Sequence, residues 1–306
     1  MPTTHVAMPK QLQQLAKPLV WWLAVRPKTL VIATLPVCVG GVLAHGNSGF
    51  YLPAFCCALL CALLIQMGTN LSNDYFDGVQ QADGPNRVGP VRVTQAGLLQ
   101  PKQVQQAFVV VFALAALFGL YLVQRAGYGI LLLGIASIAS GIGYTASSYS
   151  LARTGLADVW VVLFFGIVAT AGTDYVQTLQ LNWQAVYVGT AIGLLAVAPL
   201  AVNNLRDRQQ DAQVGKRTLV VRFGHAFGCV EYTLAMLLPV MMMVCLMFYT
   251  ANYFLLLPIV LLLLGAVGCI WRVWRATKPQ HFLPLLPQTA AVLALFGTTF
   301  CLSWLL

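Results

Sequence analysis

Only 8% of the 306 residues are charged and 59% are hydrophobic, whereas a soluble globular chain carries roughly 25% charged residues. This composition excludes a soluble protein and indicates a chain that lies largely in lipid. A net charge of +9 would favour a nucleic-acid partner in a soluble chain, but here the basic residues flank apolar runs, so they indicate membrane topology and no nucleic acid.

Residues 1–28 precede the first apolar run and are polar and basic. They do not show the ordered n-region, h-region and cleavage site of a secretory signal. We expect a cytoplasmic lead-in, with a surface helix that ends at Trp21 and Trp22.

Apolar runs of about 20 residues, the length that a membrane-spanning helix needs, recur along the rest of the chain. They predict an all-α integral membrane protein with nine transmembrane helices. The expected spans are 29–45, 51–71, 104–123, 128–147, 157–178, 185–205, 228–249, 254–272 and 287–305. We expect residues 29–306 to form one transmembrane domain, with spans one to four and five to eight as a parallel pseudo-repeat and the ninth span added.

The distribution of basic residues predicts the orientation. With a cytoplasmic N-terminus, 16 of the 17 lysines and arginines lie on the cytoplasmic side and only Arg125 lies outside. The two longest loops, 72–103 and 206–227, are then both cytoplasmic. We expect a multi-pass protein of the bacterial inner (plasma) membrane.

The eight cysteines lie in or beside the apolar runs, with no CxxC pair and no histidine at ligand spacing. We therefore interpret them as small apolar residues and not as metal ligands.

The first acidic cluster follows the second span and runs from Asn70 to Asp83. At 3.6 residues per turn, Asn70, Asn73 or Asp74, and Asp77 share one helix face. Carboxylate and amide oxygens suit Mg²⁺, which is commonly shared with substrate phosphates.

The second cluster follows the sixth span, and Asn203, Asp207 and Asp211 repeat the spacing at i, i+4 and i+8. Five of the eight acidic residues of the chain lie in these two clusters. Ionisable groups near lipid are costly and are kept mainly for function. Two parallel halves would face the clusters across one cavity open to the cytoplasmic side, where metal ions would hold a polyanion.

Basic and aromatic residues near the clusters complete the expected chemistry. Cations could bind diphosphate oxygens directly, and each could equally be a residue that sets topology. They are Arg87, Arg92, Arg206, Lys216 and Arg217. An allylic diphosphate leaves a carbocation when its charge is neutralised, and aromatic rings in a dry cavity would stabilise that cation. The candidates are Tyr144, Tyr149, Phe164 and Phe165.

At these residues the chain resembles the UbiA superfamily of intramembrane aromatic prenyltransferases, and within it the MenA group that prenylates 1,4-dihydroxy-2-naphthoate in menaquinone synthesis. The matching segments begin at Arg26-Pro-Lys28-Thr29-Leu30 and Asn70 to Asp83, continue through Gly89 to Gln95, Gly143-Tyr144-Thr145, Gly155 to Asp158 and Phe164-Phe165-Gly166, and end with Asn203 to Leu219. Together they cover residues from about 20 to 305.

The resemblance implies nine transmembrane helices and two Asp-rich motifs that bind Mg²⁺, with Mn²⁺ able to take its place, and a prenyl diphosphate. It implies transfer of the prenyl chain to the naphthoate ring with loss of the ring carboxylate. By position, the metal and catalytic residues are Asn70, Asp74, Asp77, Asp83, Asn203, Asp207 and Asp211. The implied substrate-binding residues are Lys28, Asn70, Asn73, Arg92, Tyr144, Asn203, Arg206, Lys216 and Arg217.

The chain departs from the MenA pattern at Gln81, Ser148, Ser150, Asp158 and Asp174. These departures leave other acceptors open: 4-hydroxybenzoate, homogentisate, or a naphthoquinone precursor that takes a phytyl chain. A secondary transporter is the alternative from another class, although its charged residues would be expected near the middle of the membrane and not at the span ends.

Overall fold

The structure is a computed structural model that describes residues 15–80, 92–146 and 150–306. These residues form helices and no strand. The elements are α2 (Lys17–Val25), α3 (Pro27–Gly46), α4 (Leu52–Val79), α5 (Pro101–Ala126), α6 (Tyr128–Gly143), α7 (Leu151–Thr154), α8 (Ala157–Val161), the π-helix η1 (Val162–Val168), α9 (Ala169–Thr178), α10 (Trp183–Gln213), α11 (Leu219–Phe223), α12 (His225–Thr250), the 3₁₀ helix η2 (Tyr253–Leu255), α13 (Leu256–Arg275), the 3₁₀ helix η3 (Pro279–Phe282) and α14 (Leu285–Leu305).

Within the described ranges, eight helices are long and apolar enough to cross a membrane. Each coincides with a predicted span, and the remaining predicted span is the shorter apolar helix α6, of 16 residues. The all-α, multi-pass membrane fold is therefore confirmed, while the number of nine crossings stays a prediction.

Local sequence signals explain where several helices begin and end. Pro27 and Pro101 occupy the first positions of α3 and α5, where a missing backbone N–H costs nothing. Asn182 caps α10 by accepting a hydrogen bond from the Gln184 N–H at 2.9 Å. Gly127, with φ of 86°, separates α5 from α6, because glycine adopts this backbone conformation without strain.

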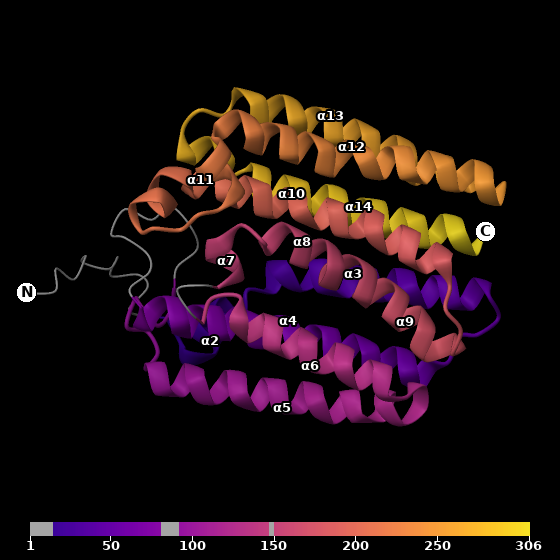
Figure 1. Cartoon of the computed structure of the whole chain (residues 1–306), viewed down its shortest axis with the longest axis horizontal. Helices are drawn as coiled ribbons and strands as arrows, with labels where there is room; N and C mark the ends of the chain where they lie inside the picture. The colour runs from indigo at the N-terminus through magenta and orange to yellow at the C-terminus, as the bar shows by residue number, and fades with distance from the viewer. Residues whose placement is uncertain (1–14, 81–91, 147–149) are drawn as a thin grey trace, which may run out of the picture.

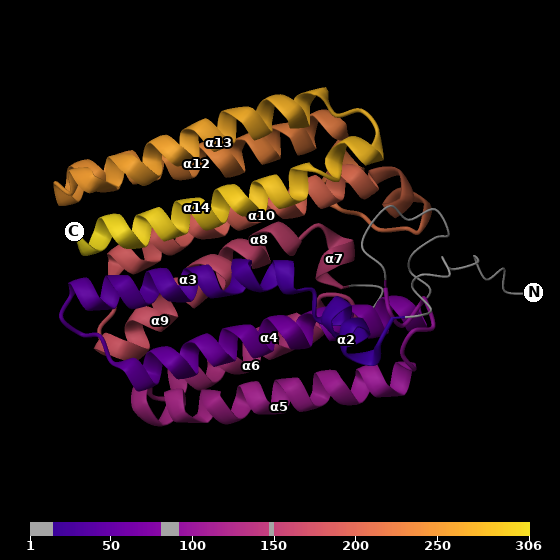
Figure 2. The same ribbon diagram turned by 180° about the vertical axis from the view of Figure 1, so that it is seen from behind.

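The long helices form a bundle of stacked layers (Figures 1 and 2). α12 and α13 lie along one side, α10 and α14 come next, α3 and the α8–η1–α9 span occupy the middle, and α4, α6 and α5 close the other side. The middle layer therefore separates α4 from α10, the two helices that carry the acidic clusters.

Small residues bring the middle layer onto α10. A Cβ added to Gly166 of η1 would overlap the backbone of Gly189 and Gly193 of α10, and one added to Gly193 would overlap Val162. Close backbone contact of this kind is the usual basis of helix packing in lipid, where apolar burial contributes little.

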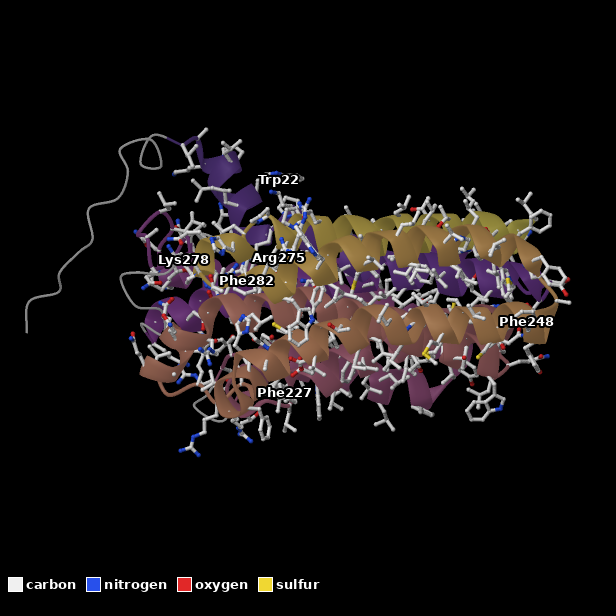
Figure 3. All side chains as sticks on the ribbon, turned by 90° about the horizontal axis from the view of Figure 1, so that it is seen from above. Trp22, Phe227, Phe248, Arg275, Lys278 and Phe282 are labelled. Carbon is white, nitrogen blue, oxygen red and sulfur yellow. The ribbon has the colours of Figure 1, made fainter. Side chains whose placement is uncertain are left out.

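The short elements α2, α7 and α11 gather at the end of the bundle where α4 and α10 finish, which we call the motif end (Figure 1). Trp22 and Lys278 lie at this end and Phe248 lies at the opposite end (Figure 3). The predicted surface helix is α2, although it continues past Trp22 to Val25. Trp22 is 60% exposed, as expected for an aromatic anchor at the membrane surface.

The helices α4 and α10 continue beyond the predicted ends of spans two and six, at 71 and 205, to Val79 and Gln213. The apolar pattern stops at the lipid boundary, but the helical hydrogen bonds do not. The described residues of both acidic clusters therefore lie on helix, as their spacing requires.

Candidate active site

Asp74 is fully buried on the last turns of α4. Its two carboxylate oxygens accept hydrogen bonds from the backbone N–H groups of Val93, at 2.9 Å, and Thr94, at 2.8 Å. Asp74 thus fixes the segment that begins at Arg92 against α4.

Asp77, one turn further along α4, forms an ion pair with Arg92. Both side chains are nearly buried, with 7% and 10% of their surface exposed. The structure therefore brings together an acidic and a basic residue that the sequence predicted separately.

The two amides of the first cluster face other elements. Asn70 Nδ2 donates to the Val25 carbonyl at 2.7 Å and the Thr29 hydroxyl at 2.8 Å, so it joins α4 to the junction of α2 and α3. Asn73 Oδ1 accepts a hydrogen bond from the Thr145 hydroxyl at 2.8 Å. In this arrangement both amides position neighbouring segments.

The second cluster lies on the last turns of α10. Asp207 pairs with the adjacent Arg206 through two hydrogen bonds of 2.6 and 2.7 Å, a bidentate geometry. Asp211 lies one turn later, 3.2 Å from Lys216 Nζ. Asn203, half-buried, lies one turn before Asp207.

Tyr144, directly after α6, lies between the two clusters. The charges of Asp158, Asp77, Asp211 and Arg26 all act on the Tyr144 phenol. Hydrogen bonds connect the same junction with the ends of both helices. The Thr145 hydroxyl donates to Asn73 of α4 at 2.8 Å. The Tyr144 carbonyl accepts from the Ala152 N–H of α7 at 3.0 Å, and α7 contacts the segment after α10 through Arg153 and Arg217.

Two of the predicted basic residues lie on the surface. Lys28, in the first turn of α3, and Arg217 are exposed, and Arg217 contributes a backbone N–H to the Arg153 carbonyl at 2.8 Å. Asp83, Arg87 and Tyr149 fall outside the described residues.

Arg26 is a site residue that the sequence reasoning missed as such. It adopts a left-handed conformation, with φ of 55°, which is strained for a residue with a Cβ. This conformation makes the sharp turn between α2 and α3 and leaves Arg26 near Tyr144. Its position directly before a proline was the available signal, because the residue before proline is kept out of the α-helical region.

The donor set fits a hard cation such as Mg²⁺ that a phosphate ligand shares. Asp77, Asp207 and Asp211 supply carboxylate oxygens from two helices, and Arg92, Arg206 and Lys216 supply cations beside them. No three His, Cys, Asp or Glu side chains in the described part of the chain are grouped closely enough to hold a metal by themselves. The arrangement is suited to a metal ion whose coordination is completed by diphosphate oxygens.

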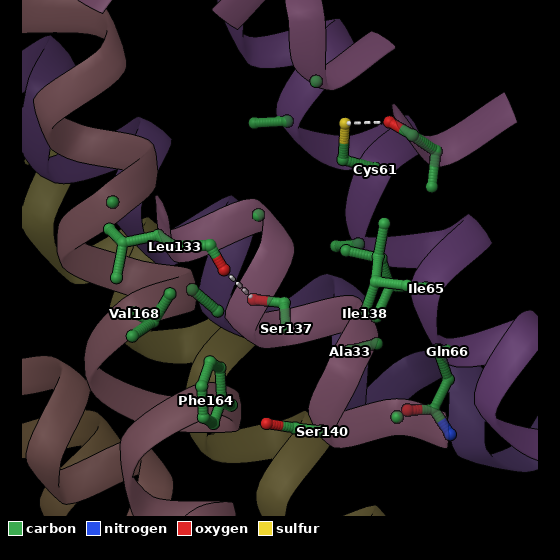
Figure 4. A pocket seen from close by; sticks show the side chains of 18 of the residues that line it. Ala33, Cys61, Ile65, Gln66, Leu133, Ser137, Ile138, Ser140, Phe164 and Val168 are labelled. Carbon is green, nitrogen blue, oxygen red and sulfur yellow. Dashed lines mark hydrogen bonds between the residues drawn. The ribbon is translucent and has the colours of Figure 1, made fainter. Parts of the chain in front are cut away.

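An apolar cavity of about 300 Å³ extends from Tyr144 between α3, α4, α5, α6 and the α8–η1–α9 span (Figure 4). Several of its few polar groups are already bonded: the Ser137 hydroxyl donates to the Leu133 carbonyl at 2.7 Å, and the Trp160 N–H donates to the Ser140 hydroxyl at 2.8 Å. Such a wall offers water little to bind and suits an isoprenoid chain.

The predicted aromatic residues Phe164 and Phe165 both line this cavity. They belong to nine cavity residues of one span that recur in pairs every four positions, from Trp160 and Val161 to Val176. An α-helix turns about 100° per residue, so a four-residue repeat would drift by about 160° over 16 residues. The π-helix η1 has more residues per turn, which reduces the drift and keeps this face on the cavity.

Comparisons with known proteins agree with this geometry. A 1,4-dihydroxy-2-naphthoate octaprenyltransferase of Escherichia coli (strain K12) is 38% identical over 69% of this chain and 71% of its own. The Haemophilus influenzae protein of the same name is 31% identical over 94% of this chain and 96% of its own.

Solved structures share the fold. The apo structure of a UbiA homolog from Aeropyrum pernix K1 matches 88% of this chain and 96% of its own, with a TM-score of 0.71 and 13% identity. A UbiA homolog from Archaeoglobus fulgidus bound to DMAPP and Mg²⁺ matches 92% of this chain and 98% of its own, with a TM-score of 0.66 and 15% identity. Residues 33–284 match the UbiA prenyltransferase family, and the chain belongs to that family.

Proposed function

We propose that this membrane prenyltransferase transfers a polyprenyl chain from its diphosphate to 1,4-dihydroxy-2-naphthoate, with decarboxylation, in menaquinone biosynthesis. The observation that carries the proposal is the meeting of two carboxylate clusters, each with its own cations, at the mouth of an apolar cavity. The octaprenyltransferases named above support the acceptor.

We assign separate residues to the metal, to the diphosphate and to the boundary between the diphosphate and the prenyl chain. Asp77, Asp207 and Asp211 would hold Mg²⁺, and the metal would supply neutralisation of the diphosphate charge. Arg92, Arg206 and Lys216 bind diphosphate oxygens. Tyr144, which lines the cavity beside the clusters, donates a hydrogen bond at the boundary between diphosphate and chain.

The reaction breaks two single bonds and forms one new carbon–carbon bond. The carbon–oxygen bond of the allylic diphosphate breaks, and its electron pair leaves with the diphosphate. The ring carbon that carries the carboxylate forms the new carbon–carbon bond, and the electron pair of the lost carboxylate bond returns to the ring as CO₂ departs. Phe164 and Phe165 line the cavity in which the allylic cation is protected from water.

The family resemblance and the basic residues also support a place in the bacterial inner membrane, with the N-terminus and the site on the cytoplasmic side. The two-half organisation of residues 29–306 belongs to the same proposal. Arg26 is the cation that we propose for the acceptor carboxylate, because its charge lies near Tyr144 at the cavity, whereas Lys28 is exposed.

A phytyl donor is the second candidate. A 2-carboxy-1,4-naphthoquinone phytyltransferase of Synechocystis is 26% identical over 70% of this chain and 69% of its own. It differs from the main proposal in the chain that is transferred and the oxidation state of the acceptor.

Purified protein in lipid nanodiscs, supplied with geranylgeranyl diphosphate, Mg²⁺ or Mn²⁺ and a panel of aromatic acceptors, tests the proposal. We expect prenylated naphthoquinol and CO₂ from the naphthoate, and no product in excess chelator. Efficient prenylation of 4-hydroxybenzoate or homogentisate with none of the naphthoate would overturn the acceptor, and full activity in chelator would overturn the metal.

A further inference from the structure

Three glycines on different walls of the apolar cavity differ from the glycines that join helices. Gly119 of α5, Gly134 of α6 and Gly172 of α9 line the cavity, and a Cβ added to any of them would meet no neighbouring atom within 4 Å. Gly166 and Gly193, in contrast, are in backbone contact with the facing helix. The three cavity glycines therefore leave space open.

Helix stability gives these positions no reason to be glycine. Glycine inside a helix costs about 1 kcal/mol relative to alanine, and here no close helix contact compensates for that cost. A larger side chain at any of the three glycine positions would fill this open space.

The three cavity glycines lie at one depth. Gly119 is seven residues before the end of α5 at Ala126, Gly134 is six residues after the start of α6 at Tyr128, and Gly172 is six residues before the end of α9 at Thr178. These three helix termini lie at the end of the bundle opposite the motif end (Figure 1). At 1.5 Å per residue, all three glycines are about 9–11 Å from that end.

The same level is where the cavity reaches the outside of the bundle. Leu120, Leu133 and Ile135 line the cavity and are 52%, 37% and 57% exposed. They are sequence neighbours of Gly119 and Gly134. A chain that enters at the motif end passes the cavity glycines where it meets lipid.

The distance from the diphosphate site sets which chains reach this level. Gly172 follows Asp158, at the motif end, by 14 residues, or about 20 Å of helix. An isoprene unit adds about 5 Å of extended chain, four carbon–carbon bonds of ordinary length. A geranyl chain would stop short of the level of the glycines, a geranylgeranyl chain would reach it, and longer chains would extend beyond it.

We propose that Gly119, Gly134 and Gly172 determine the length of prenyl chain that the protein accepts, by leaving a passage through which the distal isoprene units leave the cavity for the bilayer. This inference rests on the prenyl transfer proposed above. The three glycines are specificity-determining residues, and they have no part in the chemistry at the diphosphate.

The test compares geranyl and octaprenyl diphosphate in wild-type protein and in the single variants Gly119→Leu, Gly134→Leu and Gly172→Leu, with 1,4-dihydroxy-2-naphthoate and Mg²⁺ in nanodiscs. We expect the ratio of kcat/KM for geranyl over octaprenyl diphosphate to rise at least about tenfold in each variant. The alanine variants should show a smaller rise in the same direction. Gly268→Leu is the matched control, because Gly268 of α13 also has open space around an added Cβ but faces outward, away from the cavity.

An unchanged ratio in all three leucine variants, or an equal loss with both diphosphates, overturns the proposal. Binding of the two diphosphates is measured in parallel, by competition with a fluorescent short-chain prenyl diphosphate. If wild-type protein binds both but transfers neither to any acceptor, the proposed function fails. The ratio of the two dissociation constants in the variants still decides the role of the glycines.

Discussion

At the scale of single residues, the two aspartates on the last turns of α4 differ in their partners. Asp74 binds two backbone N–H groups and is fully buried, whereas Asp77 faces the cation of Arg92. Both carboxylates belong to the helix face that the sequence predicted. Of the two, only Asp77 pairs with a charged side chain, that of Arg92. Asp74 therefore contributes both to the site and to the position of Arg92.

The first prediction separates these two roles. Asp74→Ala leaves two buried N–H groups without an acceptor, at a cost of about 1–3 kcal/mol each, so we expect a lower unfolding temperature together with lost activity. Asp77→Asn keeps an acceptor for Arg92 and removes the charge, so kcat should fall by about 10²–10³ with little change in the unfolding temperature. Thermal unfolding and steady-state rates of both variants decide between them, and equal stability of the two would contradict the role of Asp74.

The second prediction concerns the basic residues at the start of α3. Arg26→Gln should raise KM for the naphthoate by about tenfold or more and leave KM for the prenyl diphosphate nearly unchanged, because a charge-assisted hydrogen bond contributes about 1.5–3 kcal/mol. Lys28→Gln, two residues away and exposed, is the matched control and should leave both values nearly unchanged. A higher KM in Lys28→Gln with no change in Arg26→Gln would show that Lys28, and not Arg26, binds the substrate.

The sequence predicted which residue types meet at the site. It did not predict which of them face the substrate and which bond to neighbouring helices. Helical spacing was enough for Asp77, Asp207 and Asp211, because their periodicity needs no tertiary information. The bonds of Asn70 to Val25 and Thr29 depend on how far α4 is rotated against α2 and α3. That rotation is set by packing, which the sequence pattern does not report.

At the scale of elements, the π-helix η1 keeps one span in phase with the cavity and in contact with α10. The sequence predicted a continuous span at 157–178, and the structure confirms its bounds. The change of helix type within it has no signal in hydrophobic periodicity, because both faces of the span are apolar. The four-residue recurrence of its cavity residues becomes visible only when the cavity is known.

The third prediction tests the contact between η1 and α10. Gly166→Ala places a Cβ against the backbone of Gly189 and Gly193, and overpacking of this kind costs about 1–3 kcal/mol. We expect a lower unfolding temperature. Gly268→Ala, with open space around it, should leave the temperature the same or raise it slightly, and a similar effect of the two changes would show that the contact is not tight.

At the scale of the whole molecule, the order of apolar runs was sufficient to predict an all-α membrane bundle, because a span in lipid must satisfy its backbone within one helix. The apolar runs alone did not indicate that α4 and α10 continue past the predicted span ends, since apolar runs end where polar residues begin. Residue spacing within the acidic clusters was the better guide there.

The fourth prediction is the orientation. Single cysteines at positions 85 and 213, in a background without the eight native free cysteines, should react with membrane-impermeant reagents only from the cytoplasmic side. The reason is the excess of lysine and arginine on that side. Labelling of either position from the outer face alone would reverse the topology.

The ion pairs of the site have a consequence for how its ligands bind. Asp77, Asp207 and Asp211 each have a basic partner already, so Mg²⁺ alone must displace an arginine or lysine, and free diphosphate alone must displace a carboxylate. If these residues hold the metal and the diphosphate as proposed, the carboxylates would turn to the metal and the cations to the phosphates when both bind, and the number of opposite-charge contacts would be preserved. Each ligand would then strengthen the binding of the other by the same factor. On this proposal, the resting salt bridges favour binding of the metal–diphosphate complex over binding of either ion alone.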